Sequence, residues 1–149
     1  MITKPFDEQL FNDNDAKGRN AARAIFLKHG YVAITHPNKY AVDLILYKVN
    51  KGHIGYVEVG IKHNWIGADF PYNDVVLQQR KLKYINLDKP TFFIMFNTDC
   101  SRYLIIRGCD IDTTHIEELQ NKYVPYGEMV FKITLDKVSF NNLNSIEVN

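Results

Sequence analysis

The amino-acid sequence predicts a mixed α/β domain in which a central β-sheet is flanked by helices. An early segment places its apolar residues at helical spacing. Two apolar, β-branched runs follow it, and a polar turn suited to a hairpin separates them. A later run, residues 91–96, is apolar throughout, as is typical of a strand buried on both faces. Helical and extended segments in this order predict a mixed sheet covered by helices.

Composition indicates one globular domain spanning residues 1–149. Hydrophobic residues make up 46% of the chain and charged residues 23%, which is typical of a soluble protein. Cys100 and Cys109 lack metal-ligand spacing, and reduced thiols are the expected state. The sequence shows neither a signal-peptide pattern nor an apolar run of membrane-spanning length. We therefore expect a cytoplasmic protein that does not enter a membrane.

The first helix is expected over Ala16–His29, after an irregular arm at residues 1–12. Residues 12–15 supply several N-capping side chains, and Gly30 suits the end of the helix. Gly18 and the alanines keep one helix face slim, which favours close packing on a sheet. The further expected elements are strands at 31–35, 40–47, 55–62, 91–96, 102–107 and 129–135 and helices at 73–85 and 110–123.

Each of the two runs joined by the polar turn carries one carboxylate among apolar neighbours, Asp43 in the first and Glu58 in the second. A carboxylate in an apolar strand is costly to bury unless a charge or a hydrogen bond meets it. Two carboxylates on adjacent strands could bind one divalent cation, because Mg²⁺ prefers oxygen ligands. Side chains alternate along a strand, so Glu58, Gly60 and Lys62 share one face. Two acids and an amine on one face predict metal-dependent phosphodiester hydrolysis.

These residues resemble the PD-(D/E)XK nuclease superfamily, which includes restriction endonucleases and Holliday-junction resolvases. The resemblance covers about residues 13–107 and implies a restriction-endonuclease-like core there. A C-terminal helix and strand are expected after this core, at 110–140. It implies a Mg²⁺- or Mn²⁺-dependent endonuclease that cuts DNA, with Asp43, Glu58 and the carbonyl of Val59 as metal ligands. The sequence departs from the motif at Val42, where proline is common, and at Gly60, where the lysine is expected. Lys62 would then be a migrated catalytic lysine.

Further site residues are expected around this core. Asp15 either caps the first helix or serves as an accessory acid, which the resemblance suggests. The basic run after residue 77 offers Arg80, Lys81 and Lys83 as phosphate contacts, with a solvated helix face as the alternative. The loop after Lys62 adds His63 and the aromatic ring of Trp65, which either stacks on a nucleobase or pins the loop to the core.

The sequence contains no motif for the other reactions considered: it has no P-loop, no zinc-ligand spacing and no nucleophile elbow. The main alternative is a nuclease-like domain that no longer cuts and serves as a DNA-binding or protein-interaction module. Gly60 and the net charge of +1 favour it. A third reading puts Asp43 and Glu58 on the exposed side of a hairpin without function. The nucleic-acid substrate stays open, as does a homodimer, and the resemblance is consistent with a phage-encoded enzyme.

Overall fold

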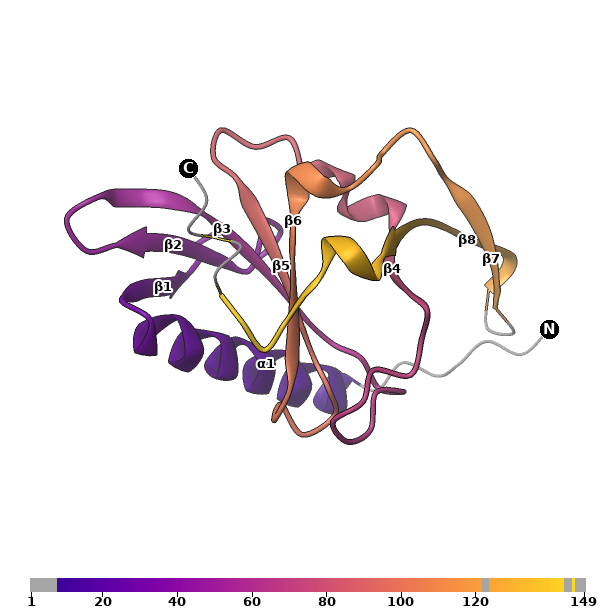
Figure 1. Ribbon diagram of the computed structural model, residues 1–149, viewed down its shortest axis with the longest axis horizontal. Coiled ribbons are helices and arrows are strands. Elements are labelled where there is room, and N and C mark those ends of the chain that lie inside the picture. Colours follow the sequence, from indigo (N-terminus) through magenta and orange to yellow (C-terminus); the bar gives the residue numbers. More distant parts are fainter. Residues whose placement is uncertain (1–7, 122–123, 144–145, 147–149) are drawn as a thin grey trace.

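The computed structural model describes residues 8–121, 124–143 and 146. A long helix comes first, and strands with short 3₁₀ turns follow it (Figure 1). The elements are α1 (Glu8–Lys28), β1 (Tyr31–Thr35), β2 (Leu44–Lys48), β3 (Gly52–Ile61), β4 (Asp74–Gln78), η1 (Gln79–Tyr84), β5 (Thr91–Phe96), β6 (Tyr103–Arg107), η2 (Gly108–Asp110), β7 (Glu117–Asn121), β8 (Val124–Thr134), η3 (Leu135–Lys137) and β9 (Ser139–Phe140).

Within the described residues, six strands form a mixed sheet in the order β1-β2-β3-β5-β6-β9. Strands β3 and β5 are parallel, and the other neighbouring pairs are antiparallel. Strands β2 and β3 form the predicted hairpin, in which Asn50 and Gly52 adopt positive φ angles of 69° and 77°. Strand β5 is buried along its whole length, as its apolar run predicts. The predicted central mixed sheet is confirmed.

Helix α1 covers one face of this sheet, and it crosses β3 closely. Ala22 and Phe26 of the helix are fully buried against Leu44, Leu46 and Val57 of the sheet. Gly18 makes the close approach possible, because a Cβ atom at this position would lie 3.0 Å from the Val59 side chain. A larger residue would push the helix away from the strand.

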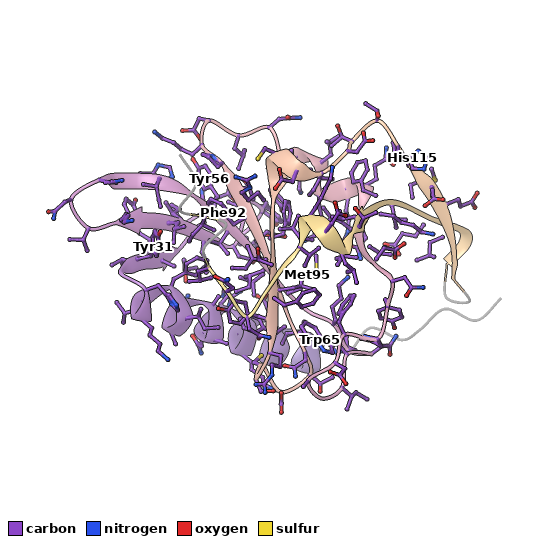
Figure 2. The ribbon with its side chains drawn as sticks, viewed as in Figure 1. Tyr31, Tyr56, Trp65, Phe92, Met95 and His115 are labelled. Atoms are coloured by element: carbon purple, nitrogen blue, oxygen red, sulfur yellow. The ribbon has the colours of Figure 1, made fainter. Side chains whose placement is uncertain are left out.

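The opposite face is covered by a second sheet with the order β4-β8-β7. Val75 and Leu77 of β4 and Phe131 of β8 pack with Phe93 and Met95 of β5 in a second core. Figure 2 shows Tyr31 and Phe92 of the first core to the left of Met95 and Trp65 of the second. The central sheet is therefore sandwiched between a helix and a smaller sheet.

The helix predicted over residues 73–85 is wrong, because this segment forms β4 and η1. Its burial alternates, with Val75 and Leu77 inside and their neighbours half-buried, which is the period of a strand. The β-branched pair Val75-Val76 also favours extended backbone. Pairing of β4 with β8 then fixes the strand, and the helical turn that follows is of the tighter 3₁₀ type.

The helix predicted over residues 110–123 is also wrong. Residues 117–121 form β7, which pairs antiparallel with β8 and extends the second sheet. The sequence Glu-Glu-Leu-Gln has high helix propensity, and sheet pairing overrides it.

The first helix begins at Glu8, well before the predicted start, so residues 12–15 lie inside it and not at its N-terminus. Residues 8–12 of the expected irregular arm are therefore helical, and the remainder of that arm falls outside the described residues. Across the residues described, no helix combines the length and the apolar character needed to span a membrane.

Candidate active site

Asp43 and Glu58 lie opposite each other on the side of the central sheet that faces the second sheet. Leu44 pairs with Val57 across the β2–β3 hairpin, so the next residue pair in the register is Asp43 and Glu58. Leu44 and Val57 point into the core beneath α1. Alternation therefore places both carboxylates on the opposite face, as the sequence predicts.

Backbone hydrogen bonds hold the two carboxylates in place. The Val59 N–H donates to Asp43 Oδ2 at 2.8 Å, and the Asp43 N–H donates to Glu58 Oε1 at 3.1 Å. Each carboxylate is thus fixed by the backbone of the other strand. Glu58 is 7% exposed and Asp43 is half-buried, so the pair does not lie on an exposed side of the hairpin.

The pKa of Asp43 is raised from 3.8 to about 7. Burial is the largest cause, because it disfavours the charged carboxylate. The negative charge of Glu58 adds to the shift, and the hydrogen bond from Val59 opposes it. Two acids that repel each other in a partly buried position would be stabilised by a cation between them.

Lys81 of η1 supplies such a positive charge. Its Nζ donates to Glu58 Oε2 in an ion pair whose lysine side chain is 23% exposed. The amine also lies 5.5 Å from the centroid of the Tyr84 ring. The sequence analysis places Lys81 among phosphate contacts, and the structure brings it directly to a carboxylate of the site.

Lys62 shares the face of Glu58, as predicted, but its amine points elsewhere. Its Nζ donates to the backbone carbonyl of Val76 in β4 at 2.9 Å. Burial lowers the pKa of Lys62, and the charge of Glu128 partly offsets this effect. The structure therefore joins Lys62 to the second sheet, whereas the sequence predicts it as the catalytic lysine beside the carboxylates.

Asp15 lies on α1 and forms an ion pair with Arg19, one turn further along the helix. Its negative charge contributes to the raised pKa of Asp43, so it lies near the carboxylate pair. Asp15 does not cap the helix, because α1 begins at Glu8.

The surface next to the carboxylates is basic and aromatic. Arg80 and Lys83 are exposed on η1, and the Lys83 amine lies 4.9 Å from the Tyr84 ring centroid. A pocket of about 160 Å³ opens next to Val42, the residue before Asp43. Its lining residues come from the β1–β2 connection, β3 and the segment around η1: His36, Ala41, Val42, Tyr56, Lys83, Tyr84 and Leu87.

The two predicted contacts in the loop after β3 differ in exposure. His63 is exposed. Trp65 is fully buried in the second core, where its ring meets Phe70 edge-on at 5.2 Å and its indole N–H donates to Ala68 O at 3.4 Å. The Trp65 ring offers no free face to a nucleobase and instead pins the loop to the core, the second of its two predicted roles.

The donor set suits a divalent cation that keeps part of its water shell. Among the described residues, no group of three or more His, Cys, Asp or Glu side chains could hold a metal ion. Asp43 and Glu58 provide two carboxylates, and Mg²⁺ is commonly bound by one or two carboxylates together with water and substrate oxygens. The charge repulsion within the pair favours a cation as well.

Comparisons with known proteins agree with a nuclease-like fold. Helix α1 lies on one face of a mixed sheet, and the two carboxylates lie on the other face. The chain is similar in structure to Hjc, a Holliday junction resolvase from the archaeal hyperthermophile Archaeoglobus fulgidus, with a TM-score of 0.50 and 9% sequence identity. The match covers 82% of this chain and 84% of the resolvase. At this identity the similarity establishes the fold.

No protein-family model matches the sequence, and no curated protein matches it. The functional argument therefore depends on the site itself.

Proposed function

We propose that the protein is a metal-dependent nuclease that hydrolyses phosphodiester bonds in DNA. The observation that carries the proposal is the pair of half-buried Asp43 and buried Glu58, fixed by reciprocal backbone hydrogen bonds on one face of a nuclease-like sheet. Buried acids with a strongly raised pKa are typical of functional sites. The fold shared with a DNA resolvase supports the same class of substrate.

Asp43 and Glu58 would bind Mg²⁺ or Mn²⁺, with the backbone carbonyl of Val59 as a further ligand. When bound, the cation supplies positive charge for the phosphate and lowers the pKa of water. In the reaction, a water oxygen forms a bond to phosphorus as one ester P–O bond breaks. One water proton passes to the leaving oxygen, and the other stays on the new phosphate group until it ionises. The backbone bonds to both carboxylates hold their oxygens in place during this exchange.

An amine near the phosphate would stabilise the negative charge that builds up on it. Two lysines, Lys62 from the sequence analysis and Lys81 from η1, reach the carboxylate face of the sheet. Arg80, Lys83 and His63 are exposed, and we expect them to contact the flanking phosphates. A homodimer would place two such sites on the two strands of a duplex.

The test is a cleavage assay with Glu58→Gln beside the wild-type protein, on plasmid, linear, single-stranded and four-way-junction DNA and on RNA. Each substrate is incubated with Mg²⁺, Mn²⁺ or EDTA. We expect cleavage that requires the metal and falls about 10³-fold in Glu58→Gln, because a buried ligand charge is lost. The preferred substrate then names the enzyme's task.

Glu117→Gln is the matched control, because it makes the same change at an acid on β7 of the second sheet. Glu117 pairs with Lys132 at 3.3 Å, and both side chains are well exposed, so the change should affect little. Equal cleavage by Glu58→Gln and the wild type would exclude this site. If no substrate is cut by a folded protein, the non-catalytic binding module, which Gly60 favours, takes its place.

A further inference from the structure

Position 60 is where the resembled motif has its lysine, and this chain has glycine there. A Cβ built at Gly60 would fit without a clash, because it would meet only Met95 Cγ, at an ordinary contact distance of 3.9 Å. Gly60 is also absent from the residues with positive φ, so neither its backbone nor its surroundings require glycine. Position 60 therefore accepts a side chain at its Cβ, and β3 itself supplies no amine there.

Two lysines reach this face, Lys81 and Lys62. Among the described residues, Lys81 contacts a carboxylate of the pair and Lys62 does not. Its Nζ donates to Glu58 Oε2, whereas Lys62 Nζ donates to the Val76 carbonyl. The η1 turn that carries Lys81 is fastened to the β1–β2 connection, since the Tyr84 hydroxyl donates to Tyr40 O at 3.4 Å. Lys81 is thus held at the site and remains partly open to solvent, where a phosphate group could reach it.

We propose that Lys81 is the catalytic amine of this site and that it replaces the lysine missing at position 60. The inference rests on the proposed nuclease function. An ammonium group has three N–H donors. One can remain on Glu58 while another donates to a non-bridging phosphate oxygen, which gains negative charge as water attacks. Lys81 transfers no proton in this role. Lys62 joins β3 to the second sheet.

The first test compares Lys81→Met with Lys132→Met, which removes a lysine from the exposed Glu117 ion pair of the second sheet. Single-turnover cleavage by Lys81→Met should fall about 10²-fold or more, and cleavage by Lys132→Met should match the wild type. Circular dichroism and the urea midpoint establish that each variant is folded.

Mn²⁺ binding without DNA, measured by calorimetry, separates a catalytic from a structural role. Removal of the Lys81 ammonium takes away a positive charge that competes for Glu58. The Mn²⁺ affinity of Lys81→Met should therefore equal or exceed that of the wild type, by up to about tenfold for one charge-assisted hydrogen bond. A loss of Mn²⁺ affinity as large as the loss of cleavage would show that Lys81 only shapes the site, and would overturn the inference.

A relocated lysine gives the sharpest test. In the double variant Gly60→Lys with Lys81→Met, the new side chain projects on the same face as Glu58, and its Cβ fits beside Met95. Cleavage should recover at least tenfold over Lys81→Met, and the same recovery is decisive if Lys81→Met alone folds poorly. No recovery by the folded double variant would contradict the inference.

Failure of the inference and failure of the proposed function give different results. If the wild type cleaves, Glu58→Gln does not and Lys81→Met cleaves normally, the nuclease function stands and Lys81 is not its amine. Loss of cleavage in Lys62→Met instead would return the role to Lys62. If the wild type cleaves no substrate with either metal, both proposals fall.

Discussion

Strand β3 has two faces of opposite character. On one face Val57, Val59 and Ile61 pack against α1 in an apolar core. On the other face Glu58, Gly60 and Lys62 alternate with them, and the two ionisable side chains reach groups of β4 and η1. Strand β3 therefore lies between the apolar core beneath α1 and a layer that contains ionisable side chains.

The ionisable groups lie on the face that we propose to be functional. Burial raises the pKa of Asp43 and lowers the pKa of Lys62, so both groups resist their charged forms in this layer. Groups of this kind cost stability, and they are common where a protein needs them for binding or catalysis. The face beneath α1 carries no such cost and fixes the position of β3.

The largest effect on stability is expected on the apolar face, from Gly18→Val. A Cβ at this position would lie 3.0 Å from Val59 Cγ1, and the two methyl groups of valine would force α1 away from β3. Overpacking of this kind typically costs about 1–3 kcal/mol. The free energy of unfolding from urea titration measures the cost. An unchanged urea midpoint would mean that α1 does not press on β3 as closely as the structure shows.

A smaller, pH-dependent effect is expected on the polar face, from Lys62→Met. The pKa of Lys62 is lowered in the folded state, so below that pKa the protein bears the cost of burying the charge. Between the folded and the unfolded pKa the unfolded chain binds more protons, and the stability of the wild type rises with pH. The stability of Lys62→Met relative to the wild type should therefore fall from pH 7 to pH 10.5.

Urea titrations of both proteins at several pH values measure this difference, and other groups that titrate in the range cancel between them. Glu128, whose charge favours the ammonium form of Lys62, is present in both. A stability difference that rises with pH would contradict the direction of the pKa shift.

The hairpin and the sheet around it follow from the sequence. Apolar β-branched runs and a turn with Asn50 and Gly52 predict β2 and β3, and the register then pairs Asp43 with Glu58. In the second sheet, the strand expected at 129–135 is confirmed as part of β8, whereas β4 and β7 are predicted as helices. Strand β7 consists of helix-forming residues, and it becomes a strand only by pairing with β8.

The site is predicted to the extent that it depends on local geometry. Alternation along β3 places Glu58 and Lys62 on one face, and this is confirmed by their contacts with η1 and β4. The direction of a lysine amine depends on four rotatable bonds and on its neighbours, which the sequence does not specify. A signal for Lys81 exists, since strand-like alternation of Val75 and Leu77 indicates a strand and not a helix before the basic run. A strand predicted here changes which basic side chains of the run are expected to face the sheet.

The smallest effect is expected from Gly60→Ala on the polar face, where the added methyl group would contact only Met95 Cγ at 3.9 Å. Removing glycine reduces the entropy of the unfolded chain, so this variant should be about 0.4–1 kcal/mol more stable than the wild type. Gly55→Ala on the same strand is the matched comparison, because its Cβ would lie 2.7 Å from the Pro90 carbonyl oxygen, and it should lose stability. Urea midpoints of the two variants shifting in opposite directions would establish that position 60 accepts a Cβ. A loss of stability in both would show that it does not, and that a lysine at position 60 has no room to replace Lys81.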